Sequence, residues 1–161
     1  MNDLQILHDE LLIGHPVTGP YSADAATAAE EINAANRAQL VPITSGELLA
    51  WSGAKSDGDR PRIIKIEQGE TSTVEDVAAI CKVAAETIRR DGTELNLNRA
   101  DRVAMVSALV AAGVLSQADS DSLYSLATQA ISRATEIGLS NVRAGTVEQA
   151  RALTQQQGGG V

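Results

Sequence analysis

The near absence of aromatic side chains is the feature that most constrains how this chain can fold. Its 161 residues include no Phe, one Trp (Trp51) and two Tyr (Tyr21 and Tyr124), although 43% of the residues are hydrophobic. With few large side chains to fill space, a dense core requires close backbone approach between elements rich in Ala, Val, Leu and Ile. Ala-rich helices pack in this way, so the composition favours a helical protein.

Apolar residues recur at helical spacing along most of the chain. The length fits one ordinary domain, and the pattern predicts an all-α, single-domain helical bundle of about six short helices, formed by residues 22–151. Residues 1–21 combine a short amphipathic segment with turns at prolines and are expected to form an extended N-terminal docking segment. The Gln- and Gly-rich residues 152–161 are expected to form a flexible tail.

Polar residues at the expected helix starts refine these boundaries. The strongest helix is predicted over residues 72–90, where Ser72 and Glu75 form a capping-box pattern and Cys81 falls on the apolar stripe as a buried thiol. This helix is expected to lie at the centre of the core. Other helix starts are predicted at N-caps or capping boxes: Ser22, Ser116 with Asp119, and Thr146. The helix after Ser116 is expected to carry Ala130 and Ile131 on its inward face.

One short run has the composition of a strand instead. Residues 62–66, Arg-Ile-Ile-Lys-Ile, are β-like and centre on Ile64. A single strand cannot make a sheet, so the run is predicted to be an extended connector or a strand that pairs with a partner chain.

The charge of the chain argues against two classes of partner. The formal net charge is −8, whereas phosphate binding requires clustered Lys and Arg. No apolar run approaches the roughly 20 residues of a membrane span, and the first residues lack the basic region of a signal peptide. We therefore expect a soluble protein, cytosolic when it is made, with no direct nucleic-acid contact and no membrane contact.

No arrangement of side chains points to catalysis. His8 and His15 do not have the i, i+4 spacing of a helical pair of metal ligands. Asp119 and Asp121 lack the glycine and the distal glutamate of a calcium loop, and no Walker, dinucleotide-binding or nucleophile-elbow motif occurs. The lone Cys81 excludes an intramolecular disulfide. The sequence therefore predicts a non-enzymatic protein with no cofactor and no metal.

The segment Ser132-Arg-Ala-Thr-Glu-Ile-Gly-Leu139 has the pattern of a short capped helix. Ser132 is placed to cap it, Gly138 to end it, and Leu139 to pack back onto it. Arg133 can pair with Glu136 three residues on, which we favour, or with a carboxylate elsewhere in the core or in a partner.

This segment also carries a resemblance, together with residues spread over most of the chain. These are Gly19-Pro-Tyr21, Ala28-Ala-Glu-Glu-Ile-Asn-Ala-Ala-Asn-Arg37, Trp51 in a short helix, Val147 and Ala150-Arg151. They resemble the corresponding residues of a family of small tailed-bacteriophage proteins. The resemblance implies a gene of the virion-structure and assembly module.

The function expected on this basis is that of a bacteriophage structural or virion-assembly protein acting through protein–protein contacts. Its partner would be a phage structural protein, a second copy of the chain, or both, and the protein would pass from the host cytoplasm into the virion. An acidic phage inhibitor that binds a host enzyme or defence protein is the alternative. Trp51 is a candidate for the core as well as for an interface. The residues predicted to contact a partner are Tyr21, Trp51, Ile64, Arg133 and Glu136.

Overall fold

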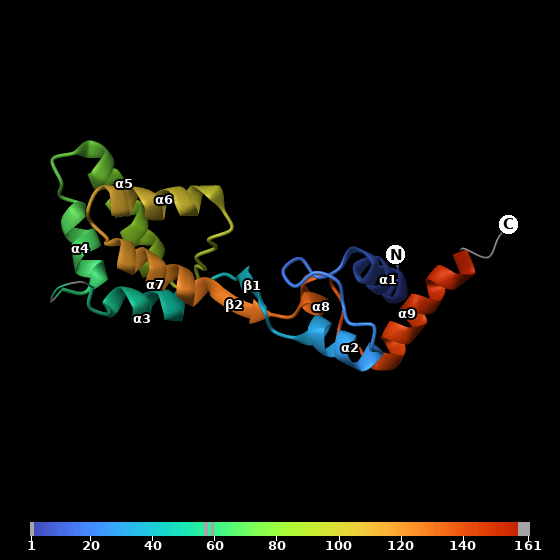
Figure 1. Ribbon diagram of the computed structural model, residues 1–161. Helices are drawn as coiled ribbons and strands as arrows, with labels where there is room; N and C mark the ends of the chain where they lie inside the picture. The colour runs from blue at the N-terminus through green and yellow to red at the C-terminus, as the bar shows by residue number, and fades with distance from the viewer. Residues whose placement is uncertain (1, 57, 59, 158–161) are drawn as a thin grey trace. The chain divides into compact units, whose positions relative to one another are not determined.

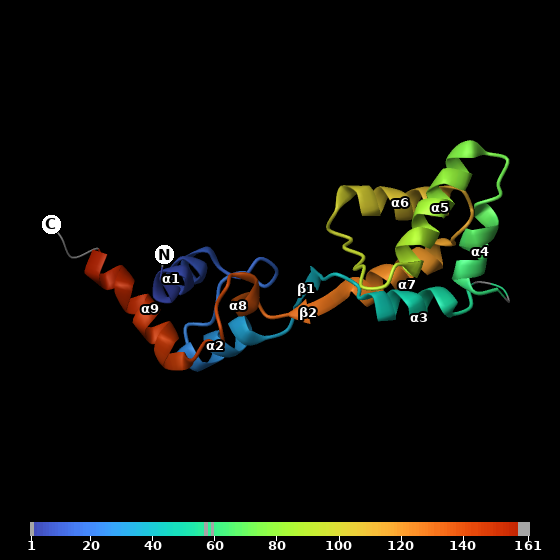
Figure 2. The same ribbon diagram turned by 180° about the vertical axis from the view of Figure 1, so that it is seen from behind.

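The structure, a computed structural model, describes residues 2–56, 58 and 60–157. Helices dominate the described residues, and two short strands pair in a small sheet (Figures 1 and 2). The predicted helical character is confirmed. A purely α-helical fold is not, because β1 (Arg37–Leu40) and β2 (Thr128–Ile131) are hydrogen-bonded neighbours.

The chain divides into two compact units with separate hydrophobic cores. The first unit comprises Met1–Ala38 and Ala130–Val161, and the second comprises Gln39–Gln129. The expected single bundle is therefore not confirmed. Helical periodicity identifies which face of each helix is buried, but it does not specify which buried faces meet.

The first unit is built from α1 (Asp3–Ile13), α2 (Ala25–Asn33), α8 (Arg133–Glu136) and α9 (Ala144–Gln157). α1 and α2 both pack on α9, and Figure 2 shows α1 beside α9. Small side chains allow this close approach. The buried apolar residues are Leu7, Ala28, Ala29, Ile32, Ala134, Leu139, Val142, Val147 and Ala150.

Both ends of the described chain are more ordered than predicted. Residues 3–13 of the expected extended segment form α1, and the side chain of Leu7 is buried in the core. Residues 152–157 of the expected tail belong to α9, while residues 158–161 lie outside the described residues. The apolar positions of α1 pack against α9, so this helix is part of the unit rather than an extended segment.

Two predicted helix starts in the first unit are wrong, and one is confirmed. Asp24, not Ser22, caps α2 by accepting from the backbone N–H of Thr27, because the Ser22 hydroxyl is occupied by the N–H of Asp24. α9 begins at Ala144, which places Thr146 inside its first turn. Ser132 caps α8 as predicted, and Leu139 is buried after Gly138, which has a φ of 81°.

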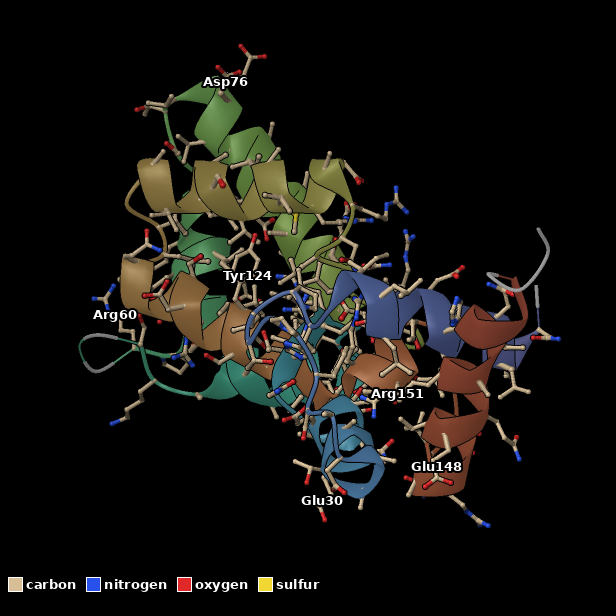
Figure 3. All side chains as sticks on the ribbon, turned by 45° about the vertical axis from the view of Figure 1, so that its right-hand side comes forward. Glu30, Arg60, Asp76, Tyr124, Glu148 and Arg151 are labelled. Carbon is tan, nitrogen blue, oxygen red and sulfur yellow. The ribbon has the colours of Figure 1, made fainter. Side chains whose placement is uncertain are left out.

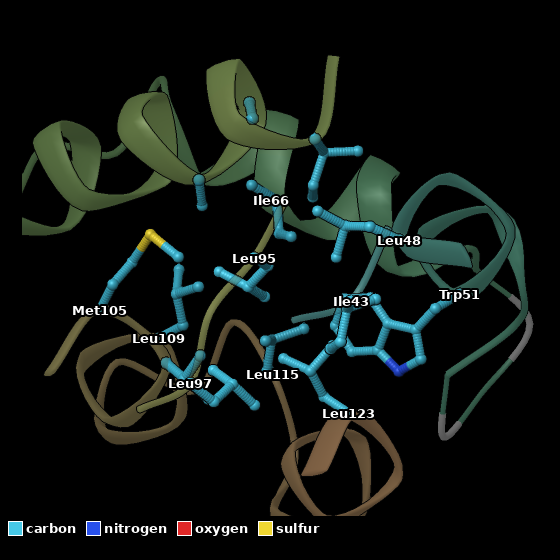
Figure 4. Close-up of a cluster of buried hydrophobic side chains, with 14 of the residues drawn as sticks. Ile43, Leu48, Trp51, Ile66, Leu95, Leu97, Met105, Leu109, Leu115 and Leu123 are labelled. Carbon is cyan, nitrogen blue, oxygen red and sulfur yellow. The ribbon is translucent and has the colours of Figure 1, made fainter. Parts of the chain in front are cut away.

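The second unit contains α3 (Ser45–Gly53), α4 (Arg62–Gly69), α5 (Glu75–Arg89), α6 (Ala100–Ala111) and α7 (Gln117–Ala127). α5 contacts α3, α4 and α6, and Cys81 on it is fully buried as predicted. Trp51 lies in the same core, together with Ile43, Leu48, Ile66, Leu95, Leu97, Met105, Leu109, Leu115 and Leu123 (Figure 4). Burial raises the pKa of the Cys81 thiol, which suits a packing role.

Three local predictions in the second unit need correction. Residues 62–66 are helical in α4, since Pro61 precedes the first turn and Ile63 and Ile66 are spaced to face the core. α5 starts at Glu75, because the Ser72 hydroxyl accepts from the N–H of Val74 and leaves no capping box. α7 ends at Ala127, and the next four residues form β2.

Candidate functional site

A chain of charged side chains connects four segments of the first unit. Glu10 on α1 accepts two hydrogen bonds from Arg133 on α8, at 2.9 and 2.8 Å, and one from the Tyr21 hydroxyl at 2.6 Å. Arg133 also donates to Glu136 at 2.8 Å, and Glu136 accepts two bonds from Arg37 at 2.8 and 3.1 Å. We call these five residues the charge network.

Burial and pairing set the protonation of the charge network. Burial by itself raises the pKa of Glu10, which is only 4% exposed, but the bonds from Arg133 and Tyr21 outweigh it and lower that pKa. The bonds from Arg37 and Arg133 lower the pKa of Glu136 to about 2. Burial and the neighbouring Glu10 carboxylate raise the pKa of Tyr21. The network therefore holds two carboxylates, two guanidiniums and a neutral phenol at neutral pH.

A tight loop follows α1 and lies next to this network. His15 and Gly19 exchange backbone hydrogen bonds at 2.8 and 2.9 Å, which closes the loop over residues 16–18. Gly14 has a φ of 87°, and a Cβ added there would lie 3.0 Å from the carbonyl oxygen of Gly19, so the entry to the loop needs glycine. The imidazole of His15 is buried and meets the Tyr21 ring edge-on, with 5.9 Å between ring centroids.

The most exposed large apolar side chains of the described residues lie at this same place. Leu12 and Ile13, at the end of α1, are 66% and 82% exposed, and Val17, on the loop, is 69% exposed. We call these three residues the α1 apolar surface. The three residues lie within six positions of one another in the sequence, and exposed apolar patches are typical of protein interaction sites.

The structure brings together three of the five residues predicted to contact a partner. Tyr21, Arg133 and Glu136 belong to the charge network, and the Arg133–Glu136 pair is formed as expected. Trp51 and Ile64 lie in the second unit. Trp51 is 9% exposed in the core, and Ile64, on α4, is 38% exposed.

A second polar cluster supports Trp51. Its indole N–H donates to the Ser122 hydroxyl at 2.8 Å, and the Arg62 guanidinium lies 5.0 Å from its ring centroid. Arg62 also pairs at 2.8 Å with Asp119, which is 1% exposed. Burial opposes ionisation of Asp119, yet bonds from Ser56, Ser116 and Arg62 bring its pKa to about 2.

The same cluster contains a serine next to a lysine. The Ser56 hydroxyl accepts from Lys65 at 2.9 Å and donates to Asp119 at 2.5 Å. A nucleophilic serine needs a base that can take its proton, and a carboxylate with a pKa of about 2 is a poor base. The Ser56 hydroxyl thus joins Lys65 to Asp119 at the start of α7.

Two kinds of feature are absent from the described residues. Within them, no three His, Cys, Asp or Glu side chains are grouped so as to hold a metal ion. Of the described helices, none has the length and apolarity needed to cross a bilayer.

Sequence reasoning missed Glu10, Arg37 and His15 as parts of this site. Glu10 follows the buried Leu7 by three residues, so helical spacing places a carboxylate on the core-facing side of α1. That position was a detectable signal for a buried ion pair. The pairing of Arg37 with Glu136 joins residues 99 apart in sequence, which no local pattern indicates.

Comparison of this chain with protein-family models, with curated proteins and with solved structures finds no match.

Proposed function

We propose that this protein is a non-enzymatic bacteriophage structural or virion-assembly component that acts through protein–protein contacts at the α1 apolar surface. The sequence resemblance to small tailed-phage proteins supports the class of function. The observation that carries the proposal is the position of Ile13, Val17 and Leu12, whose exposed fractions are the largest among the large apolar residues that the structure describes. All three lie in the segment expected from sequence to dock.

The charge network supports this assignment by fixing the α1 apolar surface in place. Glu10 and Tyr21 flank that surface in sequence, and both are bonded within the network. A surface held rigid before binding loses less conformational entropy when a partner docks. The network is thus suited to presenting the apolar surface rather than to binding a partner directly.

Charge favours a larger phage structural protein, rather than a second copy, as the partner. Residues 1–38 and 130–161 contain eight Asp and Glu against four Arg, and this excess of negative charge opposes the association of two copies of the unit. Figure 3 shows Glu30 on α2 and Glu148 on α9, and both are exposed. The partner surface should therefore be apolar at its centre and basic at its rim. The protein would be made in the host cytoplasm and then enter the virion.

Purified virions test the proposal. We expect mass spectrometry to find the wild-type chain at a fixed copy number per particle. Ile13→Gln with Val17→Thr should keep the melting temperature but be lost from particles, because the apolar contact area is removed. Leu49→Gln, at a residue 60% exposed in the second unit, is the matched control and should be incorporated normally.

Two outcomes would contradict the proposal. Normal incorporation of the double variant would exclude the α1 apolar surface as the docking site. Absence of the wild-type chain from virions, with stable binding to a host enzyme or defence protein, would support the inhibitor function instead.

A further inference from the structure

We propose that His15 is a pH-sensitive latch, whose neutral imidazole holds the loop of residues 15–19 closed and whose protonation opens it. The latch itself is a property of the isolated protein. Its consequence for docking rests on the function proposed above, because Val17 of the α1 apolar surface lies on this loop.

The hydrogen bonds of His15 fix one protonation state. Its Nδ1 accepts from the backbone N–H groups of both Val17 and Thr18, each at 3.2 Å. A backbone N–H can only donate, so Nδ1 must carry a lone pair and the proton of the neutral ring must be on Nε2. Nε2 is buried and has no hydrogen-bond partner in the described residues.

Protonation of the ring would make this arrangement unfavourable. The imidazolium carries N–H groups at both nitrogens, so Nδ1–H would point at two other N–H groups. Both bonds would be lost, and a positive charge would sit in a side chain that is only 3% exposed. Opening of the loop removes the clash and lets water reach the ring.

Charged neighbours of His15 affect the equilibrium between the closed and the open loop, but they do not reverse its direction. Glu10 on α1 is close enough that a charged His15 ring lowers its pKa, so the Glu10 carboxylate favours the imidazolium. That carboxylate is already paired with Arg133 of α8 and bonded by Tyr21. Glu31 on α2 accepts a hydrogen bond from the N–H of Ser22, and its charge helps to raise the pKa of Tyr21. The two N–H groups at Nδ1 act at hydrogen-bond distance and dominate.

The direction of the pH effect follows from proton counting. In the closed loop the His15 ring is neutral, whereas in the open loop the ring can be neutral or protonated. The fraction of molecules with a closed loop therefore decreases as pH falls. For an opening that takes up one proton, the equilibrium shifts by up to about tenfold per pH unit.

Nuclear magnetic resonance of the full chain tests the latch. At pH 7.5 the imidazole ¹⁵N shifts of His15 should show a proton on Nε2 and none on Nδ1. Between pH 7.5 and 5, amide protection at Val17 and Thr18 should fall by up to about tenfold per pH unit, in step with titration of His15.

Two variants make the test specific. His15→Asn places Oδ1 where Nδ1 lies, so it can accept from the same two N–H groups but cannot take up a proton. It should abolish the pH-dependent loss of protection at Val17 and Thr18. His8→Gln, at the chain's other histidine, should leave that loss in place.

Three results would overturn the latch: a proton on Nδ1 at pH 7.5, unchanged protection at Val17 and Thr18 while His15 titrates, or the same pH response in His15→Asn. The first two use the wild-type chain, so they hold even where the variant fails to fold. None of these measurements involves a partner. A latch that works in a chain absent from virions would therefore refute only the proposed function.

Discussion

Arg133 pairs with two carboxylates of the first unit at once. Its guanidinium is shared between Glu10, which is buried, and Glu136, which is 32% exposed on its side chain. The surface pair with Glu136 is worth little, because water and salt screen it. The buried pair is different, since removal of one partner leaves an uncompensated charge in the core.

Arg133→Met should therefore destabilise the protein by about 3 kcal/mol or more, because the Glu10 carboxylate loses both guanidinium bonds. Urea unfolding followed by circular dichroism measures this loss. Adding Glu10→Gln to the variant should restore part of the stability, as the buried charge is then removed. Arg143→Met, at an exposed arginine, is the control and should have little effect. Equal stability of Arg133→Met and Arg143→Met would mean that Glu10 is solvated.

Asp119 makes the second unit sensitive to acid. Its pKa is about 2 in the folded protein, below the 3.8 of an ordinary aspartate, so it contributes stability above about pH 4 that is lost as pH falls toward 2. The difference corresponds to about 2 kcal/mol. The stability gap between wild type and Asp119→Asn should shrink by about that amount from pH 6 to pH 2.

Trp51 fluorescence during urea unfolding measures this gap, since Trp51 lies in the same unit. Asp121→Asn is the matched control, because Asp121 lies on the same helix but is exposed, and its carboxylate accepts a hydrogen bond from the Gln117 amide. The difference in stability between Asp121→Asn and wild type should vary less with pH. A gap for Asp119→Asn that stays constant down to pH 2 would show that the Asp119 carboxyl is not selectively stabilised in its charged form.

Helices α4 and α5 of the second unit approach each other closely at Gly69 and Cys81. Gly69 is the last residue of α4, and a Cβ added there would lie 2.3 Å from the Sγ of Cys81 on α5. A contact this short forces the two helices apart. The close approach of α4 and α5 at Gly69 also explains why a core with few aromatic side chains can still be dense.

Gly69→Ala should lower the free energy of unfolding by about 1–3 kcal/mol. Adding Cys81→Ala removes the sulfur and should recover part of the loss, although the added Cβ still lies 3.2 Å from the Cβ of residue 81. Gly53→Ala is the matched control, since Gly53 ends α3 and has nothing within 4 Å of an added Cβ. Trp51 fluorescence again reports unfolding. A neutral Gly69→Ala would mean that α4 and α5 are packed less closely than described.

Elements with strong local signals could be predicted from sequence, and ambiguous ones could not. α5 and the capping box of α7 follow from helical spacing and from Ser116 with Asp119. The segment of residues 62–66 is too short for periodicity to distinguish a strand from a helix. Its conformation depends on the core in which Ile66 is buried. β2 forms because β1, far away in sequence, supplies its hydrogen-bonding partner.

The division into two units was beyond sequence reasoning for a related reason. The chain leaves the first unit near Ala38 and returns to it at Ala130, so one unit is made from both ends of the chain. Contacts such as that of the His8 ring with the carbonyl of Ala150, at 2.9 Å, join residues 142 apart. The site was predictable only in part for the same reason: Arg133 with Glu136 is local, whereas Arg133 with Glu10 is not.

The separate cores predict that the second unit folds on its own. Among the described residues, the sixteen that form its buried core run from Ile43 to Ala127, so a fragment of residues 39–129 retains every one of them. This fragment should show helical circular dichroism, blue-shifted Trp51 emission and one cooperative urea transition. Deletion of residues 1–21 from the full chain should have the opposite effect on the first unit, because it removes Leu7 from the core and leaves Arg133 without Glu10. In that variant Trp51 emission should stay blue-shifted while the helical signal falls. A fragment with red-shifted Trp51 emission and no cooperative transition would instead show that the second core needs the first unit in order to form.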